Sequence, residues 1–328
     1  MQTALRRILP VGAAVLLLAA LGGCQGKTDR AEGAGKPASL SAAAAGVSPQ
    51  QADTDTPAPE LTGSFDGKRA FDHVAKQVGF GPHPSGSQAI TEVQDYILVQ
   101  LTSDGCTVET DAFNAQTPDG IVPMKNILVK VPGDRQGIIL LGTHYDTKKL
   151  DMFVGADDAG SSTGVMLELA RLLCAQPQHH PVWIAFFDGE EAVKDWSETD
   201  SRYGSRQMAA KLAMSGDLKK IQAFLLADIV GSRMVRFKRE SNSDKGLTDL
   251  VWKTAKRLGY GAIFVNEEFA IEDDHLSFTK RGVPCVDVID LEIPYWHTPQ
   301  DTLDKIGSKS LAITGHVFVE TLKQLQAK

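Results

Sequence analysis

Apolar positions along residues 65–328 recur with two spacings, which predict alternating helices and strands. Apolar side chains three or four residues apart predict helices over 71–78, 88–101, 165–173, 207–214, 247–258 and 311–325. Shorter apolar or alternating runs predict strands over 107–113, 125–131, 138–141, 182–187, 223–227 and 286–291. Since near-continuous apolar strands between helices are typical of sheets covered on both faces, we expect one α/β domain with a mostly parallel, twisted central sheet flanked by helices.

The first 64 residues lack these patterns and carry targeting signals instead. Arg6 and Arg7 precede an apolar run over 11–21, which is too short for a stable membrane span and is typical of a signal peptide. The run ends in Leu21-Gly22-Gly23-Cys24, which resembles the box of bacterial lipoproteins, where cleavage precedes the cysteine and its thiol is lipidated. The alternative is secretion with cleavage at another small residue.

We therefore expect an exported protein with a signal peptide over 1–23 and a lipid on Cys24 that anchors it to a membrane. Gln25 after the cysteine favours the outer membrane facing the periplasm, and the cell surface stays open as a location. Residues 24–64 are rich in Ala, Gly, Ser, Thr and Pro and bury too little apolar surface to fold, so we expect a flexible tether. The folded domain then spans 65–328.

The composition is that of an ordinary globular protein and argues only against nucleic-acid binding. The 328 residues are 42% hydrophobic and 23% charged with a net charge of -7, and they lack the basic stripe that is typical of nucleic-acid binding. After Cys24, three cysteines remain, Cys106, Cys174 and Cys285, so the chain allows one disulfide among them and the sequence does not decide whether it forms. We expect a monomer that does not bind nucleic acid.

Two adjacent carboxylates at the end of a predicted buried strand are the strongest chemical signal. Glu190 and Glu191 follow the apolar run 182–187 through Asp188 and Gly189. Like charges this close do not both stay ionised in a dry site without a cation or a shared proton. An exposed acidic turn is the alternative, and it is favoured only if the chain holds no further ligands.

Other predicted strand ends and helix starts do supply ligands. They are His144 and Asp146 after 138–141, Asp157 and Asp158 before 165–173, Asp228 after 223–227, and His297 after 286–291. Since ligands of open α/β sheets bind at the carboxyl ends of the strands, we expect these side chains on one rim. Mixed imidazole and carboxylate ligands suit zinc, which keeps one open position when it is catalytic.

Five short motifs carry a likeness to known proteins over about 65–328. They are Phe187-Asp188-Gly189-Glu190-Glu191-Ala192 with Trp196, Asp200-Ser201-Arg202-Tyr203-Gly204-Ser205-Arg206, Asp273-Asp274-His275, Arg281-Gly282-Val283-Pro284 and Trp296-His297-Thr298. Together they resemble the zinc exopeptidase superfamily and, within it, the animal-type glutaminyl-peptide cyclotransferases, or glutaminyl cyclases. The tryptophan five residues after Glu191 and the Tyr-Gly-Ser-Arg run indicate the cyclases.

The resemblance implies a metal centre and an acid/base beside it. Asp158, Glu191 and His297 match the three ligands of a single zinc ion per chain. Glu190 matches the catalytic acid/base. The implied reaction converts the N-terminal glutamine of a peptide or protein to pyroglutamate and releases ammonia.

The resemblance also implies the surroundings of that acid/base. Asp228 and Asp273 match two acids that share its hydrogen-bond network, and by like-charge crowding they would raise its proton affinity. Trp196 and Trp296 match the walls of an apolar pocket that excludes water.

A two-zinc aminopeptidase on the same fold is the main alternative. Its ligands would be His144, Asp158, Glu191, Asp228 and His297, with Asp158 bridging the metals. All five residue types are present, so the ligand inventory does not exclude it, whereas Trp196 and the paired acids before His275 favour the cyclase. A binding domain that has lost its metal is a third option, against which the intact ligands argue.

The chain departs from the animal cyclases in two places. Those enzymes have a disulfide beside the site, and the matching positions here are Thr143 and Thr163, so another contact must hold this loop. The segment 291–295 is shorter than in the animal relatives, so the geometry of the pocket lip does not follow from the resemblance.

Overall fold

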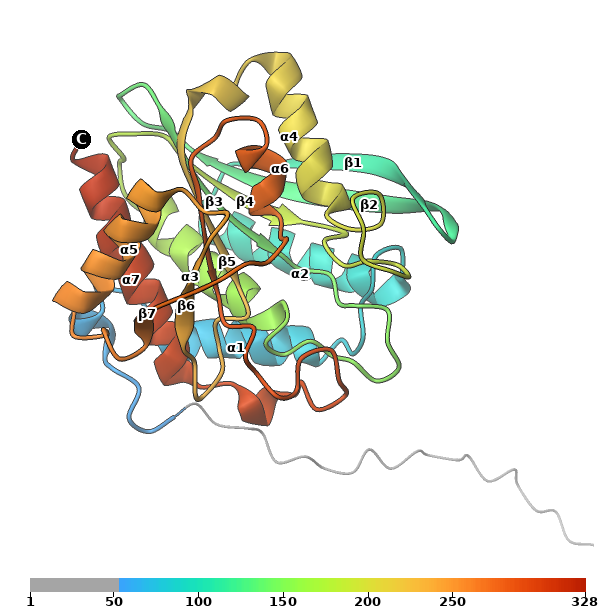
Figure 1. Cartoon of the computed structure of the whole chain (residues 1–328), viewed down its shortest axis with the longest axis horizontal. Helices are drawn as coiled ribbons and strands as arrows, with labels where there is room; N and C mark the ends of the chain where they lie inside the picture. Colours follow the sequence, from blue (N-terminus) through green and yellow to red (C-terminus); the bar gives the residue numbers. More distant parts are fainter. Residues whose placement is uncertain (1–52) are drawn as a thin grey trace, which may run out of the picture. The chain divides into compact units, whose positions relative to one another are not determined.

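The computed structural model describes residues 53–328, which contain a six-stranded sheet with helices on both faces (Figure 1). The strand order is β1-β2-β4-β3-β5-β8. The bounds are β1 (Val108–Thr117), β2 (Gly120–Val131), β3 (Ile138–His144), β4 (Val182–Phe187), β5 (Ile221–Asp228) and β8 (Cys285–Ile289). β4, β3, β5 and β8 run parallel, whereas β2 is antiparallel to both β1 and β4. The expected α/β fold is confirmed, and the antiparallel β1–β2 hairpin forms one edge of the sheet.

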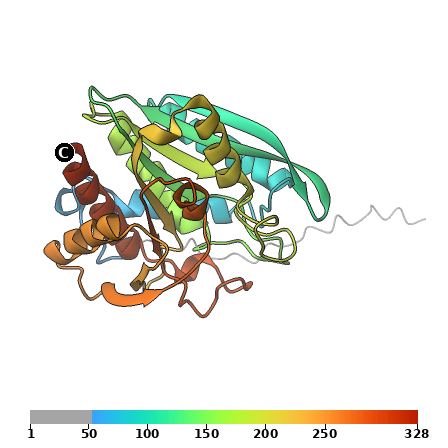
Figure 2. The ribbon, with the colours of Figure 1, turned by 45° about the horizontal axis from the view of Figure 1, so that its top comes forward.

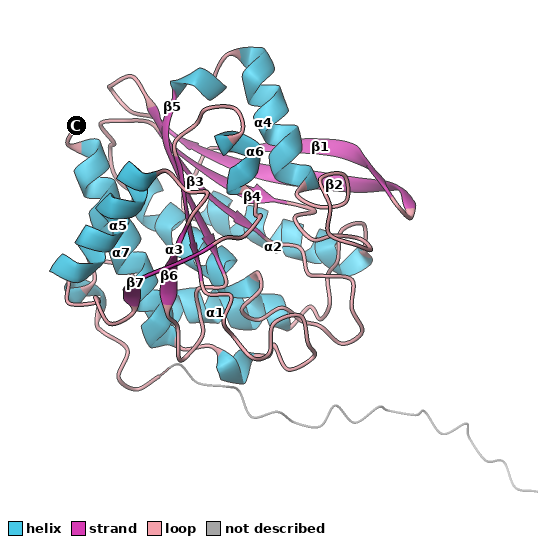
Figure 3. Cartoon of the chain, viewed as in Figure 1, coloured by secondary structure: helices cyan, strands magenta, loops and turns pink. Residues whose placement is uncertain are grey.

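Two sets of helices cover the sheet (Figures 2 and 3). One face packs against α1 (Gly67–Val78), α2 (Gln88–Ser103), α3 (Gly160–Cys174), α5 (Lys245–Arg257) and α7 (Ser308–Gln326). The other face packs against α4 (Tyr203–Ser215) and α6 (His275–Thr279). Short 3₁₀ turns lie at η1 (Pro59–Leu61), η2 (Leu218–Lys220) and η3 (Leu303–Lys305).

Alternating side chains of the central strands build both layers of the core. In β3, Ile139 and Leu141 join the cluster beneath α1, α2 and α3, while Ile138 and Leu140 join the cluster beneath α4 and α6. All residues of β3 and β4 are buried. Burial on both faces explains why these strands are continuous apolar runs rather than alternating ones.

The twelve predicted helices and strands are all present, and the structure adds a small second sheet. Its two parallel strands, β6 (Phe237–Glu240) and β7 (Phe264–Phe269), were not predicted. The sequence Phe-Lys-Arg-Glu is mostly polar, and Phe-Val-Asn-Glu-Glu-Phe is half polar without a regular alternation, so neither gives a clear strand pattern. Pairing through the backbone and the buried Phe237 and Phe264 holds them together, with the two rings 4.7 Å apart.

Part of the stretch expected to be a tether, residues 53–64, contacts the folded domain. The backbone N–H of Asp53 donates a hydrogen bond to Ser308 Oγ at the start of α7 (2.7 Å), and the Thr56 and Ser308 hydroxyls lie 2.6 Å apart. Polar bonds rather than apolar burial hold this stretch, which is why composition alone assigned it to the tether. The signal peptide and Cys24 lie outside the described residues. None of the helices within 53–328 is long and apolar enough to cross a membrane.

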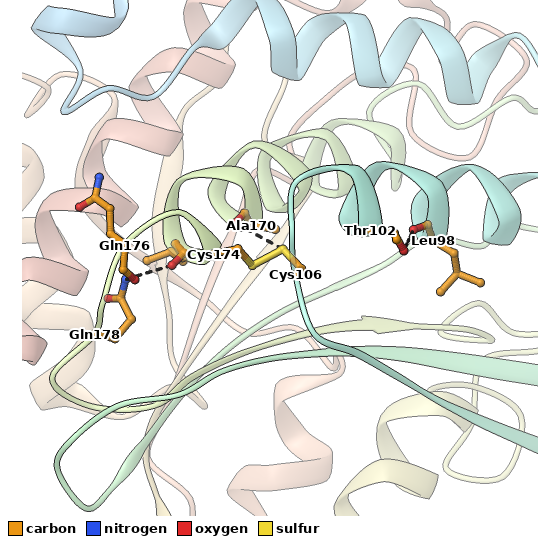
Figure 4. Close-up of a disulfide and its surroundings, with 8 residues drawn as sticks. Leu98, Thr102, Cys106, Ala170, Cys174, Gln176 and Gln178 are labelled. Carbon is orange, nitrogen blue, oxygen red and sulfur yellow. Dashed lines mark hydrogen bonds between the residues drawn. A yellow bond between two sulfur atoms is a disulfide. The ribbon is translucent and has the colours of Figure 1, made fainter.

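One disulfide forms, which answers a question that the sequence left open. Cys106, just after α2, is bonded to Cys174 at the end of α3 (Figure 4). The bond joins residues 68 positions apart and ties two helices on the same face of the sheet. Cys285 is free and buried in β8.

Candidate metal centre and active site

The candidate site lies at the carboxyl ends of the four parallel strands, as predicted. His144 ends β3, Glu190 and Glu191 follow β4, Asp228 ends β5, the loop after β8 carries Trp296 and His297, and Asp158 lies just before α3. Because parallel strands end at the same edge, residues far apart in the sequence meet here. Three of the predicted ligands form the group that we call the zinc group: Asp158, Glu191 and His297.

One ring nitrogen faces two carboxylates in the zinc group. His297 Nε2 lies 3.2 Å from Asp158 Oδ2 and 3.0 Å from Glu191 Oε1. A single nitrogen carries at most one proton, so hydrogen bonding satisfies only one of these carboxylates at a time. Ligand atoms of a tetrahedral zinc lie about 3.3 Å apart for bonds of about 2.0 Å, so the three side chains fit a zinc ion.

A second group shares Asp158 with the zinc group. His144 Nε2 lies 3.2 Å from Asp158 Oδ1 and 3.1 Å from Asp228 Oδ1. These are the residues that a two-zinc aminopeptidase would use for its second metal. His144 is only 1% exposed, and its other nitrogen, Nδ1, lies 3.1 Å from the carbonyl oxygen of Asp146. His144 is thus already in contact with protein groups through both nitrogens.

Pairing decides the charges of Asp158 and His297, whereas burial decides that of Asp228. Burial opposes ionisation of Asp158, but the hydrogen bonds of His144 and His297 outweigh it and lower the pKa of this carboxyl. Burial would lower the pKa of His297, but the contacts with Asp158 and Glu191 outweigh it and raise the pKa to about 9. Burial raises the pKa of Asp228 to about 7, although the nearby charge of His144 partly opposes this. Positive charge, whether proton or metal, is therefore favoured between the carboxylates.

A cavity of about 400 Å³ opens over the zinc group. Its polar floor includes Asp158, Glu190 and Glu191, and its apolar walls include Trp196 and Trp296. The rest of the lining comes from Lys148, Lys194, Asp195, Asp228, Ile229, Ile271, Glu272, Asp273, Ile289, Leu291 and His297. The two tryptophans are 40% and 39% exposed, so neither is a core residue. The combination of apolar walls and a few convergent polar groups is typical of a small-ligand site.

Glu190 lies in this cavity outside the zinc group. Burial is the main cause that raises its pKa well above the ordinary value; the charges of Glu191, Asp273 and Asp274 add to this, and His144 partly opposes it. Asp273 is thus close enough to Glu190 to influence its pKa, while its role in the reaction stays a prediction. The direct contact of Asp228 is with His144 instead. A carboxyl with a raised pKa is suited to exchanging protons near neutral pH.

The loop that lacks the animal disulfide is held by hydroxyl groups. Thr143 Oγ1 donates to Ser162 Oγ (2.8 Å), and Thr163 Oγ1 donates to the carbonyl oxygen of His144 (2.8 Å). All three hydroxyl residues are fully buried. Buried bonds of this kind contribute about 1 kcal/mol each and join the end of β3 to the start of α3.

Two carboxylates hold the ligand-bearing backbone: Asp146, which the sequence offered as a candidate ligand, and Asp301, which it did not single out. Asp146 accepts hydrogen bonds from the backbone N–H groups of Glu190 (3.0 Å) and Glu191 (3.3 Å). Asp301 accepts from the N–H groups of Asp157 (2.8 Å) and Asp158 (3.1 Å). The signal for Asp301 was its place four residues after His297, which lets one loop supply both a ligand and a support for another ligand.

Lys148 is a further neighbour of the zinc group that the sequence analysis missed. Its Nζ lies 3.1 Å from Glu191 Oε2, and the side chain is largely buried. Burial opposes its charge, but Glu191 outweighs this and raises the pKa of Lys148. Lys148 therefore contacts one oxygen of Glu191 while the other faces His297.

A separate buried triad lies behind the cavity. His275 Nε2 is 3.2 Å from Glu240 Oε2, and His275 Nδ1 is 3.5 Å from Asp287 Oδ2, with all three side chains fully buried. Burial raises the pKa of Asp287 well above its ordinary value. Burial opposes ionisation of Glu240, but its contacts with His275 and with backbone N–H groups outweigh this and lower its pKa. His275 is therefore a buried histidine that lies between two carboxyl groups.

Known proteins resemble this chain in both sequence and structure. The sequence model of peptidase family M28 matches residues 126–322. The glutaminyl-peptide cyclotransferase of Boiga irregularis is 31% identical over 280 residues, which cover 73% of this chain and 76% of that protein. The structure resembles the glutaminyl cyclase of an Acidobacteriales bacterium, with a TM-score of 0.76 and 38% identity over 85% of this chain and 99% of that one. It also resembles the Porphyromonas gingivalis glutaminyl cyclase, with a TM-score of 0.75 and 32% identity over 80% of this chain and 99% of that one. The chain therefore belongs to peptidase family M28 and, within it, to the glutaminyl cyclases.

Proposed function

We propose that this protein is a glutaminyl-peptide cyclotransferase that uses one zinc ion per chain. Its substrates are peptides or proteins that begin with glutamine. The observation that carries the proposal is the zinc group at the floor of a tryptophan-walled cavity, with Glu190 beside it and free of it. This arrangement provides residues that could hold a metal, a carboxyl group that can exchange a proton, and a pocket for one uncharged side chain.

Zinc would be held by Asp158, Glu191 and His297. When bound, it polarises the side-chain amide of the substrate and stabilises negative charge on the amide oxygen, an effect worth several kcal/mol. Since His297 must be neutral to act as a ligand, zinc competes with the proton that the two carboxylates otherwise favour on its ring. Metal affinity is therefore expected to fall in acid.

Glu190 would move the proton of the reaction. The substrate α-amine forms a bond to the side-chain amide carbon, and the bond from that carbon to the amide nitrogen breaks. The attacking nitrogen loses one proton and the departing nitrogen gains one, so Glu190 takes a proton from the first and gives it to the second. The raised pKa of Glu190 suits both halves of this transfer. Ammonia leaves, and the product carries a five-membered lactam.

The walls of the cavity would position the substrate. Trp196 and Trp296 present apolar faces to the glutamine side chain and exclude water. Trp296 also stacks on the ring of His297, with the centroids 4.1 Å apart, and this contact fixes the orientation of the His297 ring. Since both reacting groups belong to one molecule, correct orientation supplies much of the rate.

Mass spectrometry of a glutamine-initiated peptide tests the proposal. We expect a product lighter by one ammonia and blocked at its N-terminus, with no free amino acid. Release of the N-terminal residue would instead establish an aminopeptidase. Metal analysis is the second measurement, and we expect one tightly bound zinc per chain, held by Asp158, Glu191 and His297 as in the cyclases that the sequence resembles. Two zinc ions per chain would favour the aminopeptidase.

We also propose that the protein is exported and lipid-anchored through Cys24, with its folded domain facing the periplasm or the cell surface. The Cys106–Cys174 disulfide supports an oxidising compartment, where such bonds persist. Cys24→Ala should release the protein from the membrane fraction without changing its specific activity. Membrane retention of that variant would contradict the anchor. We propose a monomer, which light scattering on the purified protein tests.

A further inference from the structure

Trp196 lies on a loop without helix or strand, between β4 and α4. The backbone before it is fixed by the buried Asp200, whose carboxylate accepts hydrogen bonds from the N–H groups of Val193, Lys194 and Asp195 at 2.9 to 3.1 Å. These bonds end one residue before Trp196. The exposed indole therefore depends on contacts of its own to stay against the cavity.

Two charged residues contact the indole. Trp196 Nε1 donates a hydrogen bond to Glu272 Oε2 (3.2 Å), and the guanidinium carbon of Arg202 lies 5.5 Å from the ring centroid. Arg202 Nη2 reaches the same carboxylate oxygen of Glu272 (3.5 Å). The indole, the carboxylate and the guanidinium thus form a closed set of three contacts.

Arg202 is the rigid member of this set. Its side chain is 3% exposed, whereas that of Glu272 is 49% exposed. Its backbone N–H donates to the carbonyl oxygen of Glu190 (2.7 Å), and its φ of 51° is left-handed, directly before α4. A buried guanidinium requires a counter-charge, and Glu272 supplies one at the edge of the cavity.

We propose that Arg202 and Glu272 are positioning residues that clamp Trp196 as the wall of the substrate pocket. Arg202 anchors the clamp to the backbone of Glu190, Glu272 fixes the indole N–H, and together they hold the ring in one orientation before substrate arrives. Pre-organisation of this kind improves binding, because the substrate's binding free energy is not spent on ordering the Trp196 side chain. The inference rests on the proposed function, in which Trp196 contacts the glutamine side chain.

Kinetics and nuclear magnetic resonance of three variants test the clamp. Glu272→Ala should raise KM for a glutamine-initiated peptide about tenfold, the equivalent of one hydrogen bond to a charged group, with little change in kcat. Glu272→Gln keeps an oxygen that accepts from the indole but loses the charge, so KM should be restored in part. Glu268→Gln, which removes an exposed carboxylate on β7, is the matched control and should leave KM unchanged.

The indole N–H resonance reports the clamp independently of activity. The chain has four tryptophans, and loss of one signal in Trp196→Phe assigns the resonance. Glu272→Ala should shift it upfield to the position of a solvent-bonded indole, with zinc content and Tm as in the wild type. An unchanged resonance, or an unchanged KM in this variant, overturns the proposal. If the wild type makes no pyroglutamate, the proposed function fails while the resonance still tests the clamp.

Discussion

The zinc group and the buried triad have the same composition, but their histidines face the carboxyl groups differently. Each contains one histidine and two acids with atoms at 3.0 to 3.5 Å. In the triad, each nitrogen of His275 faces a different carboxyl group, but the contacts lack the geometry of hydrogen bonds. In the zinc group, one nitrogen of His297 faces both carboxylates, and the group lines a cavity. The comparison teaches that the direction of approach and access to solvent, rather than the residue inventory, distinguish a metal site from a structural ion network.

Removing a zinc-group carboxylate should have the largest effect. Glu191→Ala leaves two ligands, so we expect the purified variant to lose zinc on dialysis and to show no measurable cyclisation. Atomic absorption and the peptide assay check this. Glu198→Ala, on the exposed part of the same loop, should keep full zinc and activity. Full zinc occupancy in Glu191→Ala would remove Glu191 from the ligand set.

Glu190→Gln should separate chemistry from metal binding within the same site. The amide keeps the size of the side chain but cannot exchange a proton, so kcat should fall by about 10²- to 10⁴-fold. Zinc should stay at the wild-type level, because Glu190 lies outside the zinc group. Wild-type turnover in this variant would exclude Glu190 as the acid/base.

The triad should respond in stability rather than in metal content. His275→Ala leaves the buried carboxylate of Glu240 without its partner, and removing one member of a buried ion pair costs about 3–5 kcal/mol of unfolding free energy. Urea unfolding measures this loss, while zinc per chain should not change. His179→Ala, at an exposed histidine, is the control. A loss of zinc in His275→Ala would show that the triad is part of the metal site.

The pH dependence of stability gives the smallest and most specific effect. Burial raises the folded-state pKa of Asp287, so the folded protein holds a proton that the unfolded chain has released, and stability falls as pH rises from about 4 towards that raised pKa. The contribution is about 1.4 kcal/mol for each unit of pKa shift. Asp287→Asn lacks this proton, so it should lose less stability between pH 5 and pH 8 than the wild type does.

Urea unfolding of both proteins in chelator measures this difference, since chelation removes the pH dependence of zinc binding. Parallel stability curves for the two proteins would mean that Asp287 ionises in the triad as freely as in the unfolded chain.

Sequence reasoning succeeded where a local pattern carries the structural cause. β4 was predicted at its observed bounds because Val182–Phe187 is apolar throughout and is followed by Asp-Gly. The strand-end pattern placed candidate ligands on one rim, and the resemblance to the cyclases selected Asp158, Glu191 and His297 among them. In contrast, β6 and β7 depend on pairing between segments more than twenty residues apart, which no local pattern reveals.

The supports of the site escaped prediction for a related reason. Asp146 and Asp301 accept hydrogen bonds from backbone N–H groups of distant loops. In the sequence, an aspartate with this role cannot be told from any other aspartate. Arg202 and Glu272 are 70 residues apart, and only the folded chain brings them to Trp196. Sequence patterns therefore miss the supporting residues of a site, because the role of such a side chain depends on the position of another loop.

The two ends of helix α3 are held by different kinds of contact: hydroxyl hydrogen bonds at the N-terminal end and a disulfide at the C-terminal end. The helix begins beside Asp158, among hydroxyl-held backbone, and ends at Cys174, about 21 Å away at 1.5 Å per residue. A reductant that breaks the disulfide would free the C-terminal end of α3. The N-terminal end, near Asp158, would keep its hydroxyl hydrogen bonds, which a reductant does not affect. We therefore expect reduction of the Cys106–Cys174 disulfide to lower the stability of the domain with little effect on the candidate metal site.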